Sequence, residues 1–125
     1  MSMLDGKLQS GQLEGHKVLK FIPLVLRWAA GVPSIVQNPS NEDIALTDVG
    51  TGDVLLTFAE AGLCPLIVVG SMALSTVPGG PSNIATLKTA PTSSALALYI
   101  QSVADGATEA DPVDLHLVVC KMIAA

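Results

Sequence analysis

The chain has 125 residues, of which 50% are hydrophobic and only 14% are charged, and its net charge is −5. This length fits one domain, and the charged fraction is well below the roughly 25% of average globular proteins. The six basic residues are scattered, which excludes direct nucleic-acid binding, because a phosphate backbone requires clustered lysine and arginine. An exterior with so little charge predicts that part of the surface is covered by other protein.

The first 16 residues, MSMLDGKLQSGQLEGH, are polar and glycine-rich and lack a sustained hydrophobic period. They predict a flexible N-terminal arm that becomes ordered only on a partner, followed by a single domain over residues 17–125. The arm lacks the pattern of a signal peptide, so we expect synthesis in a reducing cytoplasm. Cys64 and Cys120 lie in the apolar contexts GLCPL and VVCKM, which favours buried free thiols over a disulfide.

The first apolar run, KVLKFIPLVLRW over residues 17–28, predicts a β-strand. Because Pro23 cannot donate a hydrogen bond within a sheet, this strand is expected at a sheet edge or a bulge. A turn with the sequence AAGVP and a short strand over residues 34–37 follow, and NPSNED then predicts a loop over residues 38–43.

A β-hairpin is predicted next. Residues 44–49 and 53–60 alternate between two sets of side chains, and the triplet Gly50-Thr51-Gly52 separates them. Glycine accepts positive φ, so the triplet can close a tight turn between the two strands. At least one of its glycines is therefore expected to have a positive φ.

The run LIVV over residues 66–69 is apolar without alternation, which predicts a strand buried on both faces. It belongs to a weakly charged stretch, residues 54–75, that has the length of a membrane-spanning helix. Glu60, Gly62 and Pro65 interrupt that stretch, and lysine and arginine do not cluster at its ends. We therefore expect no membrane span.

Three further strands are predicted over residues 84–89, 95–103 and 113–123, after the loop TVPGGPSN and around an acidic loop at 104–112. In the second of these strands, Leu96, Leu98 and Ile100 share one face. The last strand has one apolar face formed by Val113, Leu115, Leu117 and Val119. Its opposite face becomes apolar at Val118, Cys120 and Met122, which predicts the interface of a homo-oligomer.

About eight antiparallel strands between turn-rich segments, without a convincing helix, predict an all-β fold, either a jelly roll or a β-sandwich. Candidate chemistry is sparse. Asp114 and His116 lie two residues apart and could bind a metal together with Asp111, but the sequence offers no further ligand pair for zinc. The acidic loop lacks the alternating ligands of a calcium loop, and Ser71 lacks a nucleophile-elbow motif. We therefore predict no enzyme activity, no cofactor and no metal.

The segment DVGTGDVLLTFAEAGLCPLIVVGS, residues 48–71, resembles small β-domains of tailed-phage virion proteins. Those domains have a G-T-G hairpin with alternating apolar residues and a phenylalanine, then a short gap and a P-x-[VI]-V-V run. The matching residues here are Gly50, Thr51, Gly52, Val54, Leu56, Phe58, Pro65, Ile67, Val68 and Val69. The resemblance covers residues 44–123, and such domains occur in capsid decoration (cement) proteins and in tail-fibre or tailspike parts.

The resemblance implies a homotrimer on the outer surface of a virion, seated where subunits of a major capsid protein meet. The small size favours a decoration protein that stabilises an assembled capsid. The arm would then reach across a neighbouring subunit, with Leu4, Leu8, Leu13 and His16 as its contact residues. The alternative is a receptor- or glycan-binding module of a phage tail fibre or head fibre.

Overall fold

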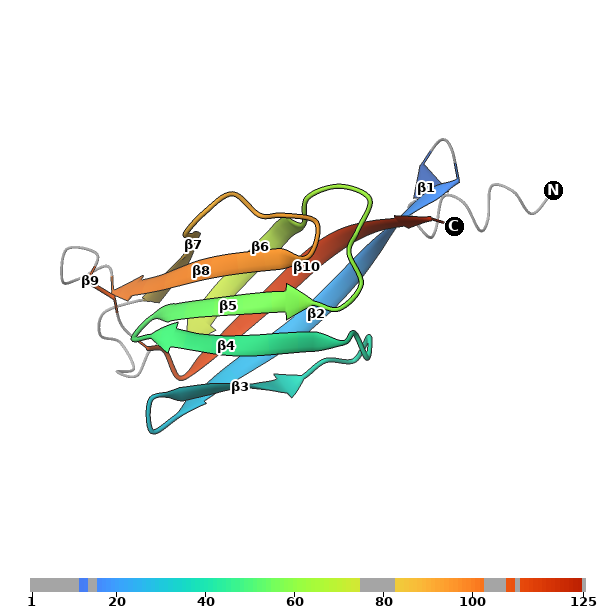
Figure 1. Ribbon diagram of the computed structural model, residues 1–125. Helices are drawn as coiled ribbons and strands as arrows, with labels where there is room; N and C mark the ends of the chain where they lie inside the picture. Colours follow the sequence, from blue (N-terminus) through green and yellow to red (C-terminus); the bar gives the residue numbers. More distant parts are fainter. Residues whose placement is uncertain (1–11, 14–15, 75–82, 103–107, 110, 125) are drawn as a thin grey trace.

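The computed structural model describes residues 12–13, 16–74, 83–102, 108–109 and 111–124, and these residues form two antiparallel β-sheets packed face to face (Figure 1). The strands in this part of the chain are β1 (Gln12–Leu13), β2 (Lys17–Ala29), β3 (Val32–Gln37), β4 (Ile44–Gly50), β5 (Asp53–Phe58), β6 (Ile67–Leu74), β7 (Asn83–Leu87), β8 (Ala95–Ser102), β9 (Thr108–Glu109) and β10 (Asp114–Ala124). The predicted all-β fold is confirmed, and among the described residues no helix is long and apolar enough to cross a membrane.

The order of the strands makes the fold a β-sandwich. Sheet A has the order β1-β2-β10-β6, with β3 also paired to β2, and sheet B has the order β4-β5-β8-β7, with β9 also paired to β8. In a jelly roll, strands pair from the two ends of the chain inward. Only the first such pairing, β2 with β10, is present here, whereas β3, β4 and β7 each pair with a strand that adjoins them in sequence.

Strand β2 lies inside sheet A, although Pro23 predicts an edge. It pairs with β10 along its whole length, from Lys17 opposite Ala124 to Arg27 opposite Asp114. On its other side, β1 pairs only with residues 17–18 and β3 only with residues 25–29. Pro23 lies between these two partners, where that side of β2 has no paired strand among the described residues. The restriction on proline is therefore satisfied locally within a central strand.

The core lies between the sheets and is built from alternate residues of four strands, together with Leu66 from the loop that precedes β6. β2 and β10 contribute from sheet A, and β5 and β8 contribute from sheet B. The buried side chains are Ile22, Leu24, Leu26, Trp28, Val54, Leu56, Phe58, Leu66, Leu96, Leu98, Ile100, Leu115, Leu117 and Val119. Burying each large aliphatic or aromatic side chain contributes about 1.5–3 kcal/mol. The inward faces predicted from alternation in β8 and β10 are confirmed at all six of their core positions.

The glycine triplet closes the predicted hairpin between β4 and β5. Gly50 pairs with Asp53, and Gly52 has a φ of 64°, as the turn requires. The Gly52 N–H donates a hydrogen bond of 2.8 Å to Asp111 Oδ1, and the Gly52 carbonyl accepts one of 2.7 Å from the Ile100 N–H. The turn is thereby fastened both to β8 and to the residues that precede β10.

The prediction that residues 66–69 are buried on both faces is wrong. Leu66 is in the core, but Ile67 and Val69 are both more than half exposed. The reason is the position of β6 at the edge of sheet A. Among the described residues it pairs only with β10, and none of them covers its outer face. A run without alternation does not distinguish cover by the same chain from cover by another protein.

Candidate interaction surface

The outer side of sheet A is an apolar surface that we call face A. Residues directly opposite each other in an antiparallel pair point to the same side of a sheet, so the strand register gives the rows of this face. The rows run across β2, β10 and β6. They are Phe21–Cys120–Ile67, Pro23–Val118–Gly70, Val25–His116–Met72 and Arg27–Asp114–Leu74, with Leu19–Met122 beyond the first.

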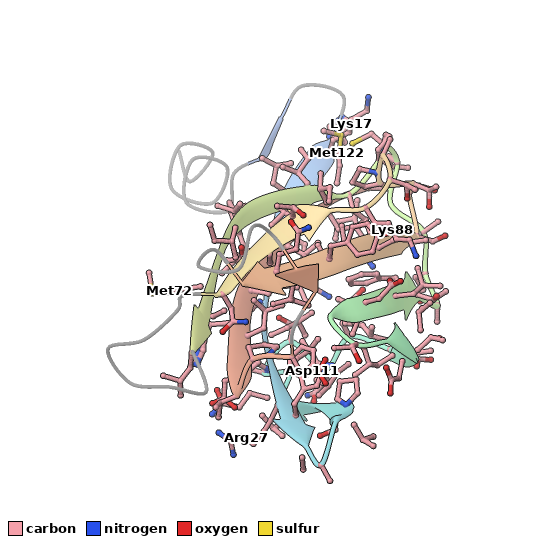
Figure 2. All side chains as sticks on the ribbon, turned by 90° about the vertical axis from the view of Figure 1, so that its left-hand side faces the viewer. Lys17, Arg27, Met72, Lys88, Asp111 and Met122 are labelled. Carbon is pink, nitrogen blue, oxygen red and sulfur yellow. The ribbon has the colours of Figure 1, made fainter. Side chains whose placement is uncertain are left out.

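Large apolar side chains on face A are open to solvent in the isolated chain. Met72 is 76% exposed, and more than half of Phe21, Ile67 and Leu74 is also exposed. Val69, the extra residue at a bulge in β6, is exposed to a similar extent. Figure 2 shows Arg27 at one end of the sandwich, Lys17 and Met122 at the other, and Met72 projecting from the side between them. A continuous apolar face of this kind indicates a site of contact with another protein.

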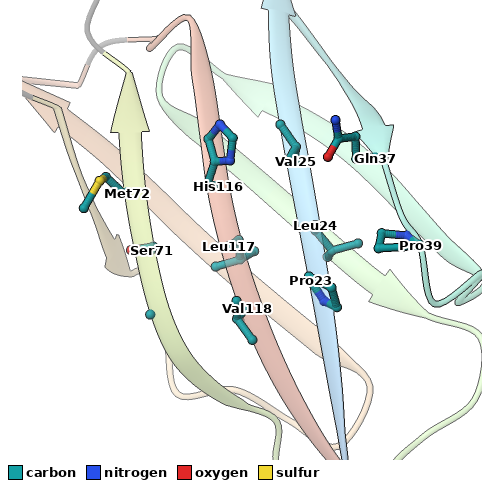
Figure 3. Close-up of a pocket in the computed structure, with 11 residues that line it drawn as sticks. Pro23, Leu24, Val25, Gln37, Pro39, Ser71, Met72, His116, Leu117 and Val118 are labelled. Carbon is teal, nitrogen blue, oxygen red and sulfur yellow. The ribbon is translucent and has the colours of Figure 1, made fainter.

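A hollow of about 510 Å³ lies in the middle of face A. Figure 3 shows its lining from β2, β10 and β6, together with Gln37 and Pro39 from beyond β2. Its β6 wall includes Gly70, where an added Cβ would meet no atom within 4 Å. The absence of a side chain at this position helps to keep the hollow open between Met72 and the middle of β10.

The structure brings the predicted interface residues together on face A. Val118 and Met122 are half-buried and Cys120 is 4% exposed, and all three point away from the core. Whether they form an interface stays a prediction. Sequence reasoning missed Phe21 and Met72, and both side chains are more than half exposed. The sequence of β2 could have indicated a second apolar face, because residues 19, 21, 23 and 25 are all apolar and lie on the side opposite the core.

Most residues of the predicted N-terminal arm lie outside the described residues, including Leu4 and Leu8. Leu13 belongs to β1, which pairs with the beginning of β2, so two residues of the predicted arm join sheet A. His16 is exposed and has a φ of 60° in the turn between β1 and β2. The proposed contacts of this arm with a capsid remain a prediction.

The charged side chains of the described part of the chain include four ion pairs, which lie apart from the middle of face A. Arg27 donates two hydrogen bonds, of 2.8 and 3.0 Å, to the carboxylate of Asp114. The hydrogen bonds and the charge of Arg27 lower the pKa of Asp114. On sheet B, Lys88 donates a hydrogen bond of 2.8 Å to Asp53 and lies 5.0 Å from the centre of the Tyr99 ring.

A second group of charges closes one end of the sandwich. Glu42, in the loop between β3 and β4, accepts hydrogen bonds from Lys121 and, at 2.7 Å, from Lys20. Lys121 is only 2% exposed, and its ammonium also donates to the Glu60 carbonyl at 3.2 Å. Burial acts to raise the pKa of Glu42, but the hydrogen bonds and charges of the two lysines outweigh it and lower the pKa. Asn38 positions Glu42 through two hydrogen bonds to its backbone.

The residues considered for metal binding have other partners. Asp114 is paired with Arg27, Asp111 accepts from the Gly52 N–H, and His116 is exposed on face A. Within the described ranges, no three histidine, cysteine, aspartate or glutamate side chains gather to hold a metal ion. Both cysteines are free, and burial, with a smaller effect of the nearby Cys64, raises the pKa of the Cys120 thiol. A raised thiol pKa disfavours the reactive thiolate.

No family model, curated protein or solved structure matches the chain.

Proposed function

We propose that the protein is a structural virion protein, a decoration protein that binds the outside of an assembled phage capsid and stabilises it. The observation that carries this proposal is the exposure of face A, where large apolar side chains have no cover from the residues that the structure describes. The resemblance of residues 48–71 to phage virion domains supplies the kind of assembly in which such a face is covered.

The mechanism is mass action. A subunit that binds the assembled lattice but not its dissociated parts stabilises the lattice by about 2.7 kcal/mol per site when its free concentration is 100 times Kd. Joining three such subunits into a homotrimer raises the effective concentration of the second and third contacts, so weak individual contacts give tight attachment. The partners are a second and third copy of the chain and the major capsid protein, at the surface of the virion.

The architecture suits a static role. The two sheets share one core of alternating aliphatic residues, and the hairpin turn at Gly52 is hydrogen-bonded to two other segments. Glu42 holds the last strand to the first long strand through Lys121 and Lys20. A rigid module of this kind loses little conformational entropy when it binds, which favours affinity at a given contact area.

The test uses capsids of the encoding phage that are assembled without this chain. Purified protein is added, and bound protein is separated from free protein by sedimentation. We expect saturable binding and a higher capsid melting temperature in a calorimeter. Recovery of the native protein with tails or fibres, together with no binding to capsids, would contradict the decoration role.

A further inference from the structure

We propose that face A is the surface through which copies of this chain bind one another, with Met72 of one copy seated in the hollow beside Gly70 of the next. This inference specifies the homo-oligomer contact within the proposed function, but its test does not depend on a capsid. Three properties of face A support this proposal: its size, its charge and its shape.

The size of face A is sufficient for a protein interface. Three strands, and part of a fourth, lie about 4.8 Å apart and extend over about eight residues at 3.3 Å per residue, which gives on the order of 400 Å² in projection. Projecting side chains such as Phe21 and Met72 increase the contact area toward the roughly 800 Å² per partner of a standard interface. Apolar side chains in such a contact provide the driving force for association.

The charge of face A favours a second copy as the partner. The chain has a net charge of −5, so two copies repel each other wherever acidic surfaces meet. From the row of Leu19 to the row of Arg27, the only aspartate, glutamate, lysine or arginine residues are Arg27 and Asp114, and they neutralise each other. His116, in the row of Val25, is the one histidine of these rows. A surface without net charge can meet an identical surface without placing like charges opposite each other. It offers no charge complementarity to a strongly acidic or basic partner.

The shape of face A supplies a projection and a matching hollow. Met72 projects from the edge strand β6 at the rim of the hollow, and Gly70 leaves open space in the same wall. If Met72 of each copy enters the hollow of the other, the contact is isologous and two copies complete it. If Met72 of one copy enters the hollow of the next without the reciprocal contact, the contact is heterologous, and it forms the proposed trimer only if the rotation between copies closes a ring.

The test measures the mass of the full chain in solution by sedimentation velocity and light scattering over a range of micromolar concentrations. Wild type is expected as an oligomer of the 12.8 kDa chain. Met72→Lys places an unpaired ammonium in the contact, and we expect it to raise the dissociation constant by at least tenfold. Since this change reduces the net negative charge, general repulsion between copies cannot explain a loss of assembly.

Gly70→Leu gives an independent test because it fills the hollow. Gly70 has no positive φ and its added Cβ would have open space, so the isolated chain is expected to fold normally. Assembly should again weaken by at least tenfold. Matched controls are Gly50→Leu, which also has open space, and Ile84→Lys, which replaces a half-exposed apolar residue on sheet B. Both controls should keep the wild-type mass, and circular dichroism checks the fold of each variant.

The outcomes separate this inference from the proposed function. A monomeric wild type throughout the concentration range would overturn the role of face A, even if the monomer still binds capsids. Loss of assembly in Ile84→Lys but not in Met72→Lys or Gly70→Leu would assign the contact to sheet B and likewise overturn it. A dimer that dissociates in the two face A variants would support the surface but contradict the trimer. An assembled ring that does not bind capsids would support face A and reject the decoration role.

Discussion

The outer surfaces of the two sheets differ in the size of their side chains, although both sheets follow the same alternation. On the outer side of sheet B, here called face B, two middle rows contain mainly small side chains, with Ala45, Thr57 and Ala95 forming one row and Thr47, Leu55 and Ala97 the next. Larger exposed apolar residues lie toward its margins, where Val49 and Ile84 are each about half exposed. Face A has phenylalanine, methionine, valine and isoleucine at the corresponding outward positions. Each face includes an ion pair between two of its own residues, Lys88–Asp53 on face B and Arg27–Asp114 on face A.

This difference separates two requirements that a β-sandwich must meet. The core requires apolar residues on the inner side of each sheet, and both sheets satisfy it. Small side chains on an outer face expose little apolar area and can remain in water. Large apolar side chains in the same positions make no contribution to the core, so their presence on face A indicates a partner outside the chain. The predictions below test this division between core, charged end and outer face.

The largest effect on stability is expected at the charged end. Glu42→Gln preserves the shape of the side chain but leaves Lys121 buried without an opposite charge, and this should cost about 3–5 kcal/mol in the free energy of unfolding. Denaturant unfolding measures the change. If Glu42→Gln unfolds at the same denaturant concentration as wild type, the ion pair between Glu42 and Lys121 does not stabilise the fold and the prediction is wrong. Asp43→Asn, which replaces an exposed neighbouring carboxylate, is the control.

A comparison of adjacent residues on β10 tests the two sides of sheet A directly. Leu117 points into the core and is 2% exposed, so Leu117→Ala should lower the free energy of unfolding by about 2–5 kcal/mol. Val118→Ala on face A should lower it by less than about 1 kcal/mol in the monomer, because this side chain is already partly in solvent. It should instead weaken self-association, as measured by sedimentation. Equal destabilisation by both changes would show that the division between core and face A is wrong.

An intermediate effect is expected at the hairpin turn of sheet B. Gly52→Val puts a β-branched residue at a φ of 64° and should cost about 1–3 kcal/mol. Thermal unfolding measures this loss, while binding to capsids at low temperature and self-association should be preserved. The substitution sharpens the comparison because it weakens sheet B without altering face A. Loss of capsid binding at unchanged stability would identify the turn as a contact site.

The smallest effect is expected from the ion pair at the end of face A, in which the Arg27 side chain is exposed and Asp114 is buried. The pKa of Asp114 is lowered in the folded protein, mainly by hydrogen bonds from Arg27. Its contribution is therefore present above the pKa of an unfolded aspartate and is lost as the pH falls through the lower folded value. In acid titrations, Asp114→Asn should show a slightly smaller loss of stability below about pH 4 than wild type. Identical acid profiles would mean that this pair adds no measurable stability.

The sequence predicted local structure well because alternation and turn chemistry are local properties. The inward positions of Leu96, Leu98 and Ile100 follow from alternation, and the turn at Gly52 follows from the conformational freedom of glycine. Strand order is different, because it depends on pairing between distant segments. Pro23 predicted an edge or a bulge for β2. The strand is central, and only the residues between its pairing with β1 and its pairing with β3 resemble an edge.

The candidate surface was predicted only in part for the same reason. Val118, Cys120 and Met122 could be recognised from one strand, whereas Phe21 and Met72 join them only when β2 and β6 are known to flank β10. The ion pair between Glu42 and Lys121 spans 79 positions and has no local signature. Lys121 follows the core positions of β10 on the inward side of the strand. A lysine at such a position requires an acidic partner, but the sequence does not show that this partner is Glu42.

The full-length pairing of β2 with β10 has a consequence for the timing of folding on the ribosome. Residue 17 pairs with residue 124, so the central pair of sheet A cannot form before β10 has left the exit tunnel. Sheet B, whose four main strands lie between residues 44 and 102, is synthesised earlier. Face A consists of β2, β10 and β6 and is therefore completed only after β10 has emerged. Nascent chains on one polysome thus cannot bind each other through face A before β10 of each chain has paired with β2.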